Sequence, residues 1–218
     1  MKTGILFDLD GTLLDSLQDL CDAVNYILKE YGCPQRTLEE IRTFVGNGAR
    51  RLIEQALPGN DTDPDADQVL IDYQNYYNAH AKVKTCPYDG VVEVLQAVAE
   101  NYPVAVVSNK PDAAVKLLCE DFFPGIYGLG EADGCPRKPA PDMLHKAMET
   151  LGVDRCVYVG DSEVDVLTAQ NTGVPCLSVL WGFRDRACLE EAGGKYFCAD
   201  PKKIPEMLET IIEEQYGK

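Results

Sequence analysis

The pattern of apolar and polar positions divides the chain into two kinds of sequence. Short apolar runs predict strands, and the segments between them carry apolar residues at helical spacing. The predicted strands are residues 4–9, 104–107, 126–129, 156–159 and 175–180. Alternating strands and helices are typical of a parallel sheet with helices on both faces. We therefore predict an α/β fold built on a doubly wound, Rossmann-like parallel sheet.

One long segment has no strand pattern. Apolar spacing within it predicts four helices, at residues 17–31, 37–44, 50–57 and 66–82. An acidic loop is predicted at residues 58–67. We predict a core formed by residues 1–15 and 86–218, with residues 16–85 inserted as an all-helical cap. Because this insert leaves the core directly after an acidic motif, we expect it to lie over that motif as a lid.

Polar residues mark where two of these helices begin. Asp15 or Ser16 can cap the first helix with a side-chain oxygen. Thr37, followed three residues later by Glu40, has the spacing of a capping box. We therefore expect the second helix to start immediately after Thr37.

Composition narrows the classes of partner. The 218 residues carry a formal net charge of −16, so nucleic acid and anionic membrane surfaces are not expected partners. An acidic protein that binds an anion needs a local positive centre, such as a divalent metal or a placed lysine. The nine cysteines contain no Cys-x-x-Cys pair, which indicates a reducing, cytoplasmic setting rather than a zinc site. The apolar run at the N-terminus is too short for a signal peptide, and no stretch is long enough to span a membrane.

Two carboxylates follow the first predicted strand. In Asp8-Leu9-Asp10-Gly11-Thr12, side chains alternate along the strand, so Asp8 and Asp10 leave its end on the same side. Gly11 permits a sharp change of backbone direction. Adjacent carboxylates repel one another and are costly to desolvate, so a bound cation and a chemical task would explain them. The alternative is an ordinary acidic turn after a strand.

Three later polar clusters follow other predicted strands or precede helices. Ser108 and Asn109 follow the second strand and can donate hydrogen bonds to a phosphoryl oxygen. Lys138 lies between prolines in a short loop, where a rigid turn can aim its ammonium at phosphate. Asp161 ends an apolar strand, and Asp165 lies one helical turn beyond it. Each also has a plainer interpretation, as a polar turn, a solvated lysine or carboxylates at a helix N-terminus.

These clusters, taken in order, carry a family resemblance. The Asp-x-Asp-Gly-Thr sequence resembles motif I of the haloacid dehalogenase superfamily in its phosphatase form. Ser108, the Lys138-Pro139-Ala140-Pro141 segment and the Gly160–Asp165 segment resemble motifs II, III and IV, in the same order. The resemblance implies a Rossmann-like core with a helical cap and phosphatase or phosphomutase chemistry.

The resemblance also implies roles for single residues. Asp8 would be the nucleophile that takes the phosphoryl group, and Asp10 the acid that protonates the leaving oxygen and then activates water. Ser108, Asn109 and Lys138 would bind the phosphate.

A Mg²⁺ ion is the implied cofactor. Asp8, the backbone carbonyl of Asp10 and Asp161 would coordinate it directly. Asp165 would lie behind these ligands without touching the ion, or would coordinate it through a water molecule. Oxygen ligands of this kind suit Mg²⁺.

The substrate is indicated less sharply. Residues 43–53 resemble the cap loop of the phosphoglycolate phosphatases within this superfamily, and the Trp181–Arg184 segment is also similar to that group. Gly46, Asn47, Gly48 and Arg50 are therefore predicted to contact a small phosphorylated metabolite. The glycines would admit close backbone approach, and an arginine could pair with a substrate carboxylate. The alternative is a simple turn between helices.

Several functions stay open at this stage. A β-phosphoglucomutase-like enzyme shares the core and helical cap, and a pyrophosphate or nucleotide phosphatase would use the same motifs. A phosphonoacetaldehyde hydrolase needs a cap lysine, which residues 45–57 lack. A binding protein on an inactive scaffold is disfavoured because all four motifs are intact. The sequence leaves a monomer and a homodimer equally open.

Overall fold

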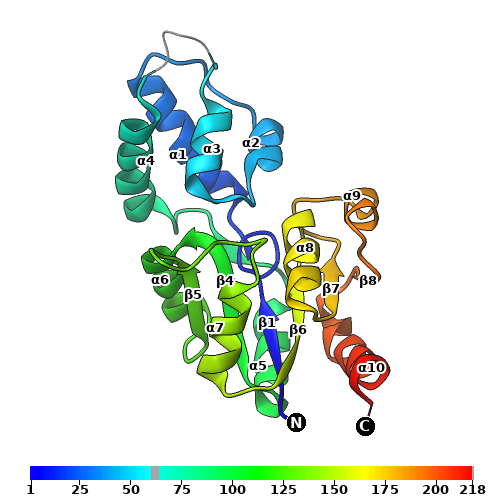
Figure 1. The fold of residues 1–218 in the computed structure, drawn as a ribbon. Coiled ribbons are helices and arrows are strands. Elements are labelled where there is room, and N and C mark those ends of the chain that lie inside the picture. The colour runs from blue at the N-terminus through cyan, green and yellow to red at the C-terminus, as the bar shows by residue number, and fades with distance from the viewer. Residues whose placement is uncertain (60–63, 218) are drawn as a thin grey trace.

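A single parallel sheet organises the core of the chain. The computed structural model describes residues 1–59 and 64–217, so residues 60–63 of the predicted acidic loop lie outside the described part. Six strands lie side by side in the order β5-β4-β1-β6-β7-β8 (Figure 1). Their bounds are Thr3–Phe7 for β1, Val104–Pro111 for β4, Tyr127–Glu131 for β5, Arg155–Gly160 for β6, Cys176–Val179 for β7 and Tyr196–Cys198 for β8. The prediction of a doubly wound parallel sheet is confirmed.

Helices cover both faces of this sheet because its strands are apolar on both sides. Ile5 and Phe7 pack with α5 (Val91–Asn101), α6 (Asp112–Phe122) and α10 (Ile204–Tyr216). Leu6, pointing the other way along β1, packs with α7 (Asp142–Leu151), α8 (Glu163–Thr172) and α9 (Arg186–Glu191). Strands buried on both faces read as continuous apolar runs, which is the pattern that predicted them.

Four helices form a second body beyond the carboxyl ends of the strands. They are α1 (Leu17–Glu30), α2 (Leu38–Phe44), α3 (Gly48–Ala56) and α4 (Ala66–His80), and we call them the α1–α4 bundle (Figure 1). Their buried side chains form their own apolar cluster, with Leu20, Ile41 and Tyr73 among its members. Phe183, which lies in the loop after β7, packs into this same cluster. The bundle therefore rests on the edge of the sheet where polar side chains emerge.

The two starts predicted for these helices have different outcomes. Thr37 and Glu40 form the predicted capping box, with the Thr37 N–H donating to Glu40 Oε2 at 2.8 Å. Ser16 stands at the N-cap position of α1, but its hydroxyl does not cap the helix. It donates instead to Asp10 Oδ1 at 2.5 Å. The capping prediction at Ser16 was wrong because a carboxylate competes with the helix for its hydroxyl.

The chain leaves for the bundle and returns from it side by side. Leu14–Asp15 (β2) and Cys86–Pro87 (β3) pair as a short antiparallel ribbon. Asp19, buried at the start of α1, accepts hydrogen bonds from the backbone N–H groups of Lys84 and Thr85. The ribbon and this carboxylate hold the two connections together. The sequence did not predict the ribbon, because two-residue strands have no detectable periodicity.

Elements near the C-terminus complete the sheet. β8 adds a sixth strand, and α10 covers the face that α5 and α6 begin to cover. We predicted no elements beyond residue 180 from the sequence, so α9, β8 and α10 were all missed. None of the described helices combines the length and apolar character needed to cross a membrane.

Candidate active site

Neighbouring strands bring the acidic segments that contain Asp8 and Asp161 together. β1 and β6 pair in parallel with Phe7 opposite Val159, so Asp8 and Asp161 follow adjacent strand ends. The Asp8 N–H donates to the Val159 carbonyl at 2.8 Å, which extends the pairing one residue further. Carboxylate oxygens of Asp8, Asp161 and Asp165 all lie within 4.8 Å of one another, and all three residues are buried. Residues separated by more than 150 positions thus form one cluster.

Lys138 is the cation at the centre of this cluster. Its Nζ lies 2.9 Å from Asp8 Oδ1, 2.8 Å from Asp165 Oδ1 and 2.7 Å from the Tyr158 hydroxyl. The side chain is 2% exposed. Burial opposes the charged form, but Asp165 and Asp8 raise the pKa of Lys138 above its usual range. The loop lysine is therefore a fixed buried ammonium and not a solvated surface group.

Asp165 holds this lysine in place. Its Oδ1 accepts from Lys138 and from the Tyr158 hydroxyl, and its Oδ2 accepts from the backbone N–H and the hydroxyl of Ser162. Although burial alone would raise its pKa, Lys138 and these hydrogen bonds hold the pKa of Asp165 below its ordinary value. With four donors on two oxygens, Asp165 is built to orient Lys138.

The same cluster leaves negative charge uncompensated. Burial, followed by repulsion from Asp165, raises the pKa of Asp8 to about 7, and burial with repulsion from Asp165 and Asp8 raises that of Asp161. Three carboxylates face one ammonium, a deficit of two positive charges that a divalent cation would fill. Buried carboxylate oxygens are ligands that Mg²⁺ prefers. The residues present therefore fit the Mg²⁺ ion that the sequence suggested.

Two glycines make room for Asp161. Gly11 has φ +83°, and a Cβ built there would lie 2.3 Å from Asp161 Oδ2. A Cβ on Gly182 would lie 2.3 Å from Asp161 Cβ. Thr12 Oγ1 and the Phe183 N–H donate to the two carboxylate oxygens at 3.1 and 2.7 Å. The turn after β1 and the loop after β7 together fix this carboxylate.

Asp10 also lines the cavity but is not part of the carboxylate cluster. It accepts from the Ser16 hydroxyl and forms an ion pair with Lys110, whose Nζ lies 2.8 Å from both of its oxygens. The aromatic ring of Tyr77 covers Lys110, with its centroid 4.8 Å from Nζ. The motifs recognised in the sequence gave Lys110 no role. The available signal was a lysine two residues after a serine at a strand end.

Ser108 and Asn109 lie within β4 and not after it, because that strand continues to Pro111. Its pairing with β5 shifts register between Val107 and Pro111, so the polar side chains emerge at an irregular part of the strand. Asn109 Nδ2 donates to the Lys138 carbonyl at 2.9 Å, and the Lys138 N–H donates to Asn109 Oδ1 at 2.8 Å. Asn109 therefore positions the loop that carries Lys138, while Ser108 lines the cavity.

Some of the residues predicted to contact substrate from the α1–α4 bundle line the cavity, and others do not. Gly46 and Gly48 line the cavity that contains Asp8, Asp10 and Lys138. Asn47 stands at the N-cap position of α3 and makes no side-chain capping bond. Arg50 pairs with Asp67 at 2.6 Å with its side chain 48% exposed, and the described residues that line the cavity do not include it.

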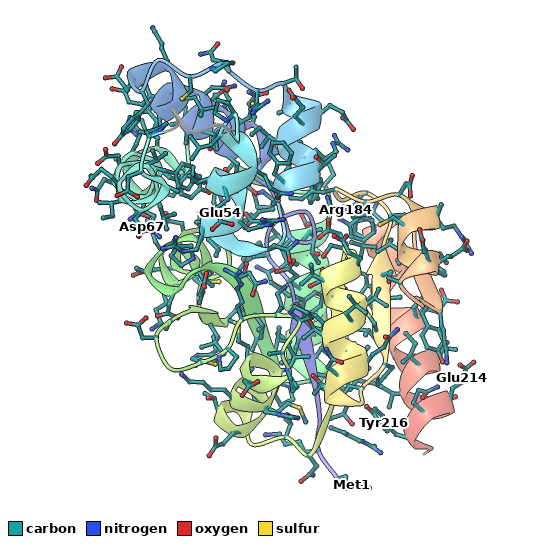
Figure 2. All side chains as sticks on the ribbon, turned by 45° about the horizontal axis from the view of Figure 1, so that its top comes forward. Met1, Glu54, Asp67, Arg184, Glu214 and Tyr216 are labelled. Carbon is teal, nitrogen blue, oxygen red and sulfur yellow. The ribbon has the colours of Figure 1, made fainter. Side chains whose placement is uncertain are left out.

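Arg184 fastens the bundle to the sheet. Its guanidinium donates to the carbonyls of Arg42 and Val45, each at 2.8 Å, and to Glu163 Oε2 at 2.8 Å. Asn109 adds a hydrogen bond to the Gly46 carbonyl at 3.0 Å. Figure 2 shows Arg184 at the junction between the bundle and the loop leading to α9, with Asp67 on the far side of the bundle. These hydrogen bonds fasten the bundle to the core beside the cavity.

Comparison with known proteins agrees with this architecture. Residues 5–179 match the haloacid dehalogenase-like hydrolase family. The chain is 34% identical to a phosphoglycolate phosphatase of Rhodobacter capsulatus, over 84% of this chain and 87% of that protein. It is 36% identical to a phosphoglycolate phosphatase of Pseudomonas syringae pv. tomato, over 96% of this chain and 81% of the relative.

A solved structure has the same fold throughout. The crystal structure of a predicted phosphoglycolate phosphatase from Haemophilus somnus superimposes with a TM-score of 0.85 at 26% identity, covering 94% of this chain and 97% of the other. The family match spans most of the chain, and the two curated relatives exceed one third identity over most of their length. The chain therefore belongs to the haloacid dehalogenase-like hydrolases and is a phosphatase of that family.

Proposed function

We propose that the chain is a Mg²⁺-dependent phosphomonoesterase that acts on 2-phosphoglycolate through an aspartyl-phosphate on Asp8. The observation that carries the proposal is the carboxylate cluster at the strand ends, with one buried lysine bound to two of its members and Asp10 lining the same cavity. The names of the curated relatives support the choice of substrate.

Asp8 is placed to attack phosphorus. It lines the cavity, and the Lys138 ammonium 2.9 Å away can bind a phosphoryl oxygen beside it. Attack by a carboxylate divides one difficult hydrolysis into two easier steps. In the first step the Asp8–phosphorus bond forms as the bond to the ester oxygen breaks. Water then cleaves the acyl-phosphate, which regenerates Asp8 and releases phosphate.

Asp10 is placed to manage the proton in both steps. It gives a proton to the leaving alkoxide and takes one from the attacking water, and such acid–base help contributes about 10²- to 10⁴-fold. The Ser16 hydroxyl at 2.5 Å fixes the orientation of its carboxylate. Because Ser16 begins α1, the proton-transfer group is linked to the start of the α1–α4 bundle.

Asp8, the Asp10 backbone carbonyl and Asp161 would hold Mg²⁺, while Asp165 is occupied with Lys138. The cation supplies positive charge that offsets repulsion between a carboxylate nucleophile and an anionic phosphate. Ser108 and Asn109 complete the phosphate side, where Ser108 is 3% exposed. Phosphoryl transfer depends mainly on positioning and charge neutralisation, which this arrangement supports.

We further propose that residues 16–85 act as a cap on a core of residues 1–15 and 86–218. Gly46, Gly48 and Tyr77 line the cavity together with the core's acidic residues, so closing the bundle would exclude water from the phosphoryl group. The protein would act in the cytoplasm on this small metabolite.

The proposal is tested by phosphate release from 2-phosphoglycolate, sugar phosphates, nucleotides and pyrophosphate, with Mg²⁺ and with chelator. We expect 2-phosphoglycolate to have the highest kcat/KM, chelator to abolish release, and Asp8→Asn to release no phosphate. Equal rates on all of these substrates would refute the assignment of 2-phosphoglycolate. Release that requires a sugar bisphosphate would favour the phosphomutase alternative.

A further inference from the structure

Lys110 is a buried cation that the proposed chemistry does not use. Its side chain is 4% exposed, and its ammonium lies between Asp10 and the ring of Tyr77. A lysine is rarely buried without a partner, because its charge must be compensated. Here the compensating group is a carboxylate that lines the cavity and is exposed to whatever occupies it.

Other cations around this cavity are already engaged. Lys138 is bound to Asp8 and Asp165, at the end of the cavity where phosphate would lie. Arg184 is bound to Glu163 and to backbone carbonyls of the bundle. Among the described residues that line the cavity, Lys110 is the cation whose carboxylate partner also lines the cavity and lies outside the Asp8–Asp161–Asp165 cluster.

Among its described residues, the bundle brings no positive charge to this part of the cavity. The bundle residues that line the cavity are apolar, aromatic or amide-bearing, including Leu20, Leu52, Tyr73, Gln74, Tyr77 and Asn78. A negatively charged group entering such surroundings pays a large desolvation cost unless a cation meets it. Lys110 is the group that can meet it.

The position of Lys110 defines which part of a substrate it would meet. Asp10 is the residue proposed to protonate the ester oxygen, and Lys110 is in direct contact with Asp10. Atoms two or three bonds beyond that ester oxygen therefore lie near the Lys110 ammonium. In 2-phosphoglycolate, a single carbon separates the ester oxygen from the carboxylate. This relation holds for a short phosphorylated acid and not for a long one.

We propose that Lys110 forms the carboxylate subsite of this enzyme, and that it exchanges its contact with Asp10 for one with the carboxylate of a short α-phosphorylated acid. The inference rests on the proposed phosphatase function. It identifies the carboxylate as the feature by which the enzyme would select its substrate. The exchange also explains why Lys110 is placed against Tyr77, since the ring shields one side of the ammonium and leaves its other side to anionic oxygens.

The test compares 2-phosphoglycolate with ethyl phosphate, which has a methyl group in place of the carboxylate. We expect Lys110→Met to lower kcat/KM for 2-phosphoglycolate by about 10- to 100-fold more than for ethyl phosphate, mainly through KM, because a charge-assisted hydrogen bond is lost. Lys110→Arg should recover part of that difference. Glycolate should inhibit the hydrolysis of p-nitrophenyl phosphate by the wild type. It should inhibit the Lys110→Met variant more weakly.

Arg50→Met is the matched control, since it removes a positive charge from the bundle at a residue paired with Asp67. If Arg50→Met rather than Lys110→Met selectively impairs 2-phosphoglycolate, the carboxylate subsite belongs to Arg50 and the inference is wrong. Equal losses on both substrates in Lys110→Met would also overturn it, and would make Lys110 a positioning residue for Asp10.

Failure of the proposed function has a different signature. A wild type that hydrolyses ethyl phosphate as well as 2-phosphoglycolate retains phosphatase chemistry but has no carboxylate subsite. A wild type that hydrolyses neither would refute the proposed function. Calorimetric binding of 2-phosphoglycolate to wild type and Lys110→Met would then decide the subsite, with equal affinities refuting it and a weaker variant supporting it.

Discussion

The ammonium of Lys138 lies 2.8 Å from Oδ1 of Asp165, and both side chains are almost fully buried. Removing one partner of such a pair leaves the other charge poorly compensated in the interior. We expect Asp165→Asn to lower the free energy of unfolding by about 3 kcal/mol. Denaturant unfolding measures this loss.

Tyr158→Phe is the control for that variant. It removes one hydrogen-bond partner of the Lys138 ammonium and keeps both carboxylates, so the expected loss is about 1 kcal/mol. A variant Asp165→Asn that is as stable as the wild type would show that Asp8 alone compensates Lys138.

The carboxylate cluster should make stability depend on a divalent cation. A ligand that binds the folded state at 100 times its dissociation constant stabilises that state by about 2.7 kcal/mol. We expect Mg²⁺ to raise the melting temperature of the wild type, and Asp161→Asn to weaken the effect because it removes one proposed ligand. Calorimetric scans across a Mg²⁺ titration measure both. Ca²⁺ and chelator serve as comparison conditions, and an equal response of the two proteins would contradict the proposed ligand set.

Gly11 should tolerate no side chain. Gly11→Ala would place a Cβ 2.3 Å from Asp161 Oδ2 in a left-handed backbone conformation. We expect loss of phosphatase activity together with a lower melting temperature, since either the turn or Asp161 must move. Gly32→Ala is the matched control, because Gly32 has φ +67° and open space around the added Cβ. Its expected cost is about 1 kcal/mol, from backbone strain alone.

Arg184 should control how firmly the α1–α4 bundle is closed. Arg184→Met removes the hydrogen bonds to the carbonyls of Arg42 and Val45. We expect faster hydrogen exchange in residues 42–48 and a higher KM, because closure over the substrate becomes less favourable. Arg186→Met is the control, since Arg186 forms an exposed pair with Glu190 on its own helix. Unchanged exchange in Arg184→Met would mean that the bundle is held by apolar packing alone.

Continuous apolar runs predicted five of the six strands of the sheet, and apolar residues at helical spacing predicted the helices up to residue 180. The family resemblance grouped Asp8, Asp161 and Lys138, and the convergence of strand ends in a parallel sheet explains why Asp8 and Asp161 meet. The sequence could not predict the pairing of Lys110 with Asp10, which depends on where one side chain turns within an irregular part of β4. The pairing of Arg50 with Asp67 was equally hidden, since each belongs to a different helix.

Ser16 illustrates the same limit on a smaller scale. Local sequence rules predicted that its hydroxyl caps the helix that it begins. In the folded chain the hydroxyl donates its hydrogen bond to the carboxylate of Asp10, six residues earlier. Short-range rules identify the position of such a residue correctly and miss its partner whenever tertiary structure supplies a stronger acceptor.

Asp8 is proposed to carry the phosphoryl group during turnover. Rapid acid quenching of Asp10→Asn mixed with 2-phosphoglycolate and Mg²⁺, followed by peptide mass spectrometry, detects such a phosphoenzyme. Because Asp10 is proposed to activate the water of the second step, its loss should let the phosphoenzyme accumulate. We expect one added phosphoryl group on the peptide that contains Asp8, and none in Asp8→Asn. Turnover without any such adduct, or an adduct on another residue, would contradict this role of Asp8.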